Sequence, residues 1–322
     1  MKKLYSIAFS VAFAAATATA GVSPSLLNLV MPDATVVSGM NVDQSITSPF
    51  GQYVLAQMQF NDSDFLQFMT ATGFDPRKDL HEIVAATPSN SSTTVHTALI
   101  LGRGVFQPAM IVGSATSKGG VITNYRGYTL IGPPPGHTDA PAAVTFLDSA
   151  IAVMGDLASV KGAIDRKLAG TAFAGPLATQ AVQLSATNSA WFATGAPLAD
   201  FMSTRQSGNL GPMAQSGLIQ SVQQASGGVQ FGSTAITLSA DAVTASPQNA
   251  QALVDVMKFF ISMIAGNAQA SPGVASIANS TQLTVSGSTA HISLVLPEAQ
   301  VEQLLMPQDK GKPARKRVAA QR

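Results

Sequence analysis

Short segments that alternate apolar and polar residues occur in pairs along this chain, and most pairs are followed by a helical stretch. The clearest pairs span residues 121–132, 142–156, 227–243 and 281–297, with turns expected at Arg126-Gly127 and Asp148-Ser149 in the first two. Alternation with period two is typical of half-buried strands, and two strands joined by a short turn pair antiparallel. The sequence therefore predicts an α+β fold, an antiparallel sheet with helices packed on one face.

The unit of a hairpin followed by a helix recurs at least four times, which predicts two similar halves. The tetrapeptide Gly-Ser-Thr-Ala occurs at 232–235 and again at 287–290, each time between two strands that lead into a helix. We expect an N-terminal half over residues 21–175 and a C-terminal half over residues 176–306. Whether the halves share one sheet stays open.

Helix starts are marked by a polar residue followed by proline. Ser48-Pro49 and Ser246-Pro247 open helical patterns, because the serine oxygen caps free amides and proline suits the first turn. Gln107-Pro108 begins another helical stretch. Residues 157–168 form a further amphipathic pattern with Val160, Ala163, Ile164 and Leu168 on one face. The apolar stretch 250–265 carries Asp255 and Lys258, so we expect a core helix, with a membrane segment as the alternative.

The first twenty residues have the pattern of a secretory signal. Lys2 and Lys3 precede an apolar run from Leu4 to Ala16, and Ala18-Thr19-Ala20 supplies small residues before the expected cleavage point. An uncut membrane anchor is the alternative. The chain has no cysteine, which excludes disulfides, thiolate metal sites and thiol nucleophiles. We expect a periplasmic or extracellular protein that is stabilised by its core alone.

Basic residues are concentrated at the C-terminus. Residues 21–309 hold ten basic and seventeen acidic residues, a net charge of −7, whereas residues 310–322 hold six basic residues. An acidic body argues against a nucleic-acid-binding domain. We expect residues 307–322 to form a disordered tail, which either only solubilises the protein or attracts anionic envelope polymers or lipids as partners.

The stretch "GFDPRKDLHEIV", residues 73–84, is the most charged part of the body. Asp75 followed by Pro76 predicts a capped helical turn that leads into a strand. In that strand His81 and Glu82 would point to opposite faces, so they would not converge on one ligand. The zinc-protease pattern His-Glu-x-x-His fails because residue 85 is alanine. We interpret the stretch as structural, with its charges solvated.

Other candidate catalytic residues lack a supporting pattern. His96 and His291 lie in strand patterns, and His137 lies in a proline-rich loop beside Asp139. Asp62 and Asp64 are the closest carboxylate pair, but Asp62 fits a helix cap. The serine-hydrolase and phosphate-loop spacings are absent, since residues 113–120 place lysine before the last glycines and fit a helix-to-strand connector. We expect Trp191 in the core, and we predict no catalytic, cofactor-binding or metal-binding residues and no cofactor.

Four segments carry a resemblance to a family of uncharacterised secreted bacterial proteins built from two similar α+β halves. These are "FDPRKDLHEIVAAT", "NYRGYTLIG", "VTFLDSAIAVMGDLASVKGAID" and "SAWFATGAPLADF", within residues 33–200. The resemblance implies the architecture and no activity. The sequence is best interpreted as a non-enzymatic binding or structural protein of the cell envelope. Two alternatives remain, a carrier of an apolar ligand and a hydrolase without a local motif.

Overall fold

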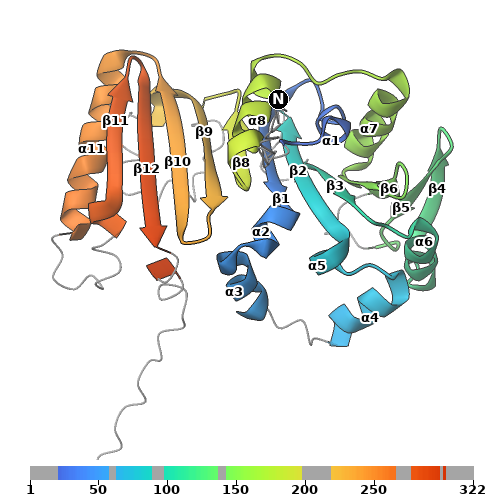
Figure 1. The fold of residues 1–322 in the computed structure, drawn as a ribbon. Coiled ribbons are helices and arrows are strands. Elements are labelled where there is room, and N and C mark those ends of the chain that lie inside the picture. The colour runs from blue at the N-terminus through green and yellow to red at the C-terminus, as the bar shows by residue number, and fades with distance from the viewer. Residues whose placement is uncertain are drawn as a thin grey trace, which may run out of the picture.

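A computed structural model describes residues 21–57, 63–88, 98–136, 143–197, 219–265, 277–297 and 300–301. Within these ranges, twelve strands form one continuous antiparallel sheet that runs through both halves (Figure 1). The order across the sheet is β11-β12-β10-β9-β8-β1-β2-β3-β7-β6-β5-β4. The predicted α+β class with an antiparallel sheet is confirmed, and the halves share one sheet. The expectation that the helices pack on one face is wrong, because the core helices of the two halves cover opposite faces.

The strands correspond closely to the alternating segments of the sequence. All four predicted hairpins form, and the first turns at Arg126 and Gly127, both with positive φ. The strand bounds are β1 (Ala34–Asn41), β2 (Leu80–Pro88), β3 (Leu99–Gly104), β4 (Val121–Tyr125), β5 (Tyr128–Gly132), β6 (Ala143–Phe146), β7 (Ile151–Gly155), β8 (Ala190–Thr194), β9 (Val222–Phe231), β10 (Ala235–Thr244), β11 (Thr281–Ser286) and β12 (Thr289–Pro297).

Helices begin at the predicted cap and proline positions. Ser48 accepts a hydrogen bond from the amide of Gly51 at 3.0 Å, and Ser246 accepts one from Asn249 at 3.2 Å. The helix bounds are α1 (Pro24–Leu27), α2 (Val42–Thr47), α3 (Pro49–Gln57), α4 (Ser63–Thr72), α5 (Pro76–Asp79), α6 (Pro108–Ser117), α7 (Leu157–Ala169), α8 (Pro176–Thr187) and α11 (Pro247–Ala265), with the 3-10 helix η3 at Ile219–Ser221.

Three helix predictions need correction. The prediction overlooked α1, α2 and α8 altogether. The expected connector over residues 113–120 is helical as far as Ser117, where α6 ends. Leu168 was predicted to share the buried face of α7, but it is 52% exposed. Val160, Ala163 and Ile164 of the same helix are fully buried, so the part of α7 that packs in the main core ends at Ile164.

The order of elements is repeated in the two halves. Apart from α2 to α5, which lie between β1 and β2, the first half runs α1, β1, the antiparallel pair β2–β3, α6 and the hairpin β4–β5, before the additional hairpin β6–β7 and α7. The second half runs α8, β8, the hairpin β9–β10, α11 and the hairpin β11–β12. The halves meet where β1 pairs antiparallel with β8, from Val36 opposite Thr194 to Met40 opposite Ala190. The boundary at residue 175 stays a prediction.

The two halves bury opposite faces of the shared sheet. One cross-strand row joins Val37, Ala193, Ser226, Asp241, His291 and Thr284, and it defines the first face. In the first half this face is apolar, and α1, α7 and α8 cover it to form the main core. In the second half the same face is polar, and the apolar residues lie on the second face, where α11 packs. In Figure 1, α11 lies beside β11 and β12, apart from the helices of the first half.

The helix α11 is a core helix along one side only. Leu253 and Val254 are buried against the strands of the second half, while Phe259 and Met263 near its end are more than half exposed. Among the described residues, no helix combines the length and the apolarity needed to cross a membrane. The predicted signal segment over residues 1–20 and the basic tail over residues 307–322 lie outside the described residues.

Candidate functional site

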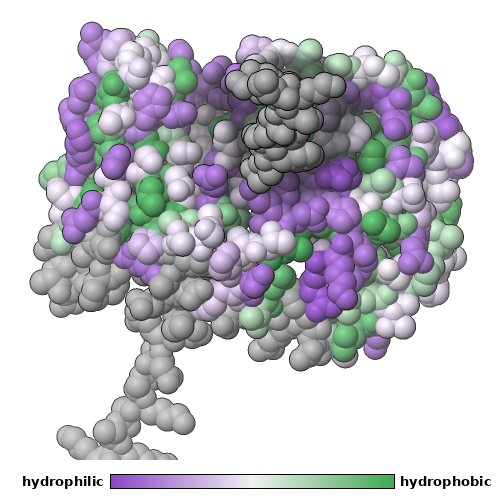
Figure 2. All heavy atoms as spheres, viewed as in Figure 1, coloured by the Kyte–Doolittle hydropathy of each residue, from purple (hydrophilic) through white to green (hydrophobic). Residues whose placement is uncertain are grey.

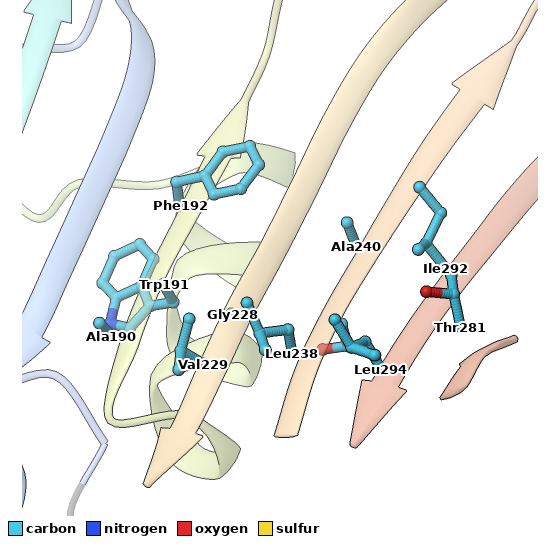
Figure 3. A pocket seen from close by; sticks show the side chains of 11 residues that line it. Ala190, Trp191, Phe192, Gly228, Val229, Leu238, Ala240, Thr281, Ile292 and Leu294 are labelled. Carbon is cyan, nitrogen blue, oxygen red and sulfur yellow. The ribbon is translucent and has the colours of Figure 1, made fainter. Parts of the chain in front are cut away.

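An apolar hollow lies on the second face of the second half, which we call the trough. Eleven described residues line it, and its volume is about 540 Å³ (Figure 3). That volume lies within the range of small-molecule sites, about 300–1,000 Å³. The lining residues come from five adjacent strands, which lie in the sheet in the order β8, β9, β10, β12 and β11.

Two rows of residues across the strands form the floor of the trough. Figure 3 shows the side chains of the outer row and, beside them along the strands, those of Phe192, Ala240 and Ile292 of the inner row. The outer row pairs Ala190, Val229, Leu238, Leu294 and Thr281. The inner row pairs Phe192, Gly227, Ala240 and Ile292. Each row is continuous in register, so the floor of the trough runs perpendicular to the strands.

Small residues in the middle strands deepen the floor. Gly227 and Ala240 occupy the centre of the inner row, and a Cβ atom at Gly227 would lie 3.0 Å from the Phe192 ring. A larger side chain there would push against this ring, which is itself 39% exposed. The glycine therefore allows Phe192 to lie close to the floor at the β8 end of the trough.

The trough is bounded along the strands by packed side chains. On one side, Ala242 and Ala290 belong to the cluster that packs under α11. On the other side, Phe231 of β9 stacks on Phe50 of α3, with ring centroids 5.4 Å apart. Between these boundaries the floor residues Leu238 and Ile292 remain partly exposed.

The described lining residues provide apolar contacts and no charged group. Each of the eleven residues is uncharged, and the side-chain hydroxyl of Thr281 donates a hydrogen bond to the backbone oxygen of Ile277 at 2.9 Å. Two other hollows, of about 230 and 670 Å³, are lined as much by polar as by apolar surface. The trough is therefore the described hollow that best suits an apolar ligand.

The opposite face of the same strands is polar. His291 and Asp241 lie side by side there, with 2.6 Å between Nδ1 and Oδ1. His291 thus lies in a strand, as predicted, and its side chain is hydrogen-bonded to Asp241. Among the described residues, no group of three or more His, Asp or Glu side chains is arranged to hold a metal ion.

The charged stretch 73–84 is a capped turn followed by a strand, as predicted. The Asp75 carboxylate accepts a hydrogen bond from the amide of Arg77 at 3.1 Å and pairs with its guanidinium at 2.7 Å. This side-chain bond to Arg77 lowers the pKa of Asp75. His81 points away from Glu82 and pairs with Asp43 at 2.8 Å.

Glu82 corrects the expectation that these charges are all solvated. Its side chain is only 7% exposed, and its two oxygens accept from the amide of Ser23 at 2.8 Å and from Nε of Arg103 at 3.0 Å. Glu82 shares a buried face with Val84 and Ala86 because alternate residues of β2 face the core. The carboxylate therefore ties the first described residues of the chain to the sheet.

The remaining candidates divide between the core and the undescribed ranges. Trp191 is buried in the main core, as predicted, and its ring lies over Gly39 of β1. His96, His137, Asp139 and Asp62 lie outside the described residues, as does the side chain of Asp64; the backbone helix α4 begins at Ser63.

Sequence reasoning overlooked the residues of the trough. The alternation of Leu238 and Ala240 with Ser239 signals an apolar face of a strand. The same alternation is expected for a fully covered core, so it does not reveal that floor residues such as Leu238 and Ile292 stay partly exposed.

Comparisons with known proteins bear on the fold alone. No protein-family model matches the chain, and no curated protein does. The solved structure of crystal form III of TP0453 is similar, with a TM-score of 0.50 and 11% identity, over 88% of this chain and 98% of that one. Crystal form IV of TP0453 has a TM-score of 0.50 and 10% identity, over 90% and 99% of the two chains. The α+β architecture therefore recurs in a protein of very different sequence.

Proposed function

We propose that this protein is a non-enzymatic binding protein of the bacterial cell envelope that holds an apolar ligand in the trough. The observation that carries the proposal is the uncharged, largely apolar lining that five neighbouring strands present together. Of the two alternatives to a purely structural role, a ligand carrier has a described site in its favour. The hydrolase has none in the described residues.

The energetics favour a ligand with many apolar groups. Burial of hydrocarbon contributes about 0.8 kcal/mol per methylene group, while association costs about 4–15 kcal/mol in lost freedom. A ligand with few carbons would therefore bind weakly. Partly exposed residues such as Leu238, Leu294 and Ile292 would lose their contact with water when such a ligand binds.

The binding test uses diphenylhexatriene, an uncharged apolar rod whose absorption overlaps tryptophan emission. Trp191 is the only tryptophan of the chain, and it neighbours Phe192 in β8. Excitation of Trp191 should therefore produce saturable energy transfer to a bound probe. An absence of saturable transfer would contradict the proposal.

Matched variants locate the binding. Ile292→Asp places a charge in the trough, while Ser293→Asp places the same charge on the polar face one residue further. Ala240→Phe fills the floor without adding a charge. We expect Ile292→Asp and Ala240→Phe to weaken binding at least tenfold and Ser293→Asp to leave it within twofold. Equal affinity in all four proteins, each confirmed as folded by circular dichroism, would place the ligand elsewhere.

Export is a further part of the proposal. The signal pattern supports cleavage after Ala20, which would leave Gly21 first in a periplasmic or extracellular protein. Mass spectrometry of the protein recovered from its native host should find Gly21 at the N-terminus. A retained Met1 would instead support a membrane anchor.

A further inference from the structure

The direction of the trough relative to the strands restricts the shape of its ligand. From this geometry we infer that the trough accepts one extended, unbranched hydrocarbon chain of about 15 carbons, which lies across the strands. The inference rests on the proposed function and specifies its ligand class.

The length of the trough follows from the sheet. The outer row runs from Ala190 in β8 to Thr281 in β11 and crosses four strand-to-strand steps. Neighbouring strands lie about 4.8 Å apart, so the row is about 19 Å long. An extended chain advances about 1.25 Å per carbon, given C–C bonds of about 1.5 Å at tetrahedral angles, so about 15 carbons cover this length.

The width of the floor admits a single chain. Successive residues on one face of a strand are about 7 Å apart, which is the distance between the inner and outer rows. Leu238 and Leu294 rise along the outer row, whereas Gly227 and Ala240 keep the middle of the inner row low. A chain that lies between the two rows contacts the leucines along its length and passes over the low middle of the inner row.

The two ends of the trough differ in their surroundings. At the β8 end the sheet continues into β1, where Met40 pairs with Ala190. At the other end β11 is the last of the described strands, and the lining residue there is Thr281. A chain with a polar end group would therefore place that group at the β11 edge, in reach of water, with its tail towards Phe192.

The test measures displacement of diphenylhexatriene by straight-chain primary alcohols of 8 to 18 carbons, each below its solubility limit. Affinity should rise about fourfold per added methylene and stop rising near 15 carbons, where the chain fills the row. Cholesterol should compete at least tenfold more weakly than the best alcohol, because fused rings are wider than one chain. A continuous rise to 18 carbons, a plateau below 10, or stronger competition by cholesterol would overturn the inference.

A variant at the end of the row provides the second measurement. Thr281→Phe should fill the β11 end of the row. The chain length at which affinity stops rising should then fall by about four carbons, since one strand-to-strand distance of about 4.8 Å equals four carbons. Thr281→Val is the control, because it loses the same hydroxyl without adding volume. An unmoved plateau in Thr281→Phe, or the same shift in Thr281→Val, would refute the orientation of the chain. Failure of the probe to bind the unaltered protein would instead refute the proposed function.

Discussion

Replacement of Glu82 by alanine should destabilise the protein by about 2–4 kcal/mol. The change removes the acceptor of the Ser23 amide, and an unsatisfied buried donor costs about 1–3 kcal/mol. It also removes the partner of Arg103, whose side chain is 38% exposed and can be hydrated again, so this loss adds only about 1 kcal/mol.

The measurement is urea unfolding followed by the fluorescence of Trp191, which lies in the main core. His81→Ala provides the control, since it removes a hydrogen bond between a neighbouring residue of the same strand and Asp43 at the surface. The His81 and Asp43 side chains are 28% and 55% exposed, so their pair should contribute about 0–1 kcal/mol. If Glu82→Ala and His81→Ala cost the same within about 0.5 kcal/mol, burial of Glu82 has no energetic consequence and the reasoning is wrong.

Three further predictions concern other parts of the chain. Because Arg77 lowers the pKa of Asp75, the ionised carboxylate stabilises the fold above its unfolded pKa of about 3.9. That stability is lost as the pH falls through the lower folded pKa. Asp75→Asn keeps the cap, so its free energy of unfolding, measured with urea from pH 3 to 6, should fall less towards low pH than that of the unaltered protein. Gly39→Ala would place a Cβ 2.6 Å from the Trp191 ring, so it should cost about 1–3 kcal/mol and shift the emission maximum; an unchanged spectrum and stability would contradict the packing. Removal of the residues after Asp309 should abolish any salt-sensitive co-sedimentation with anionic vesicles, whereas equal binding by both forms would leave the tail without this role.

Local signals in the sequence were sufficient for most of the secondary structure. The hairpin at Arg126-Gly127 and the cap at Asp75 depend on a few adjacent residues, so both can be predicted from the local sequence alone. The helix α8 was overlooked because Gly175 gives it no side-chain cap and its buried positions, such as Ala178 and Ala181, are small. Its pattern therefore has little contrast between faces.

Features that depend on distant residues could not be predicted. The sequence shows that Leu238 and Val37 each lie on an apolar strand face, but only the register across β8 and β1 shows that the two faces are opposite. The buried position of Glu82 likewise depends on Ser23 and Arg103, which lie 59 and 21 residues away. The trough follows from the same long-range order, since five strands must align before its floor exists.

The pairing of β1 with β8 has a consequence for the order of folding. β1 ends at Asn41, yet the strand that covers its second edge begins at Ala190. A ribosome adds about 5–20 residues per second, so roughly 7–30 s pass between the synthesis of the two strands. During that time a first half that folded early would present β1 as an open edge, able to pair with another chain. A chaperone that delays folding until β8 is available would protect this protein from aggregation.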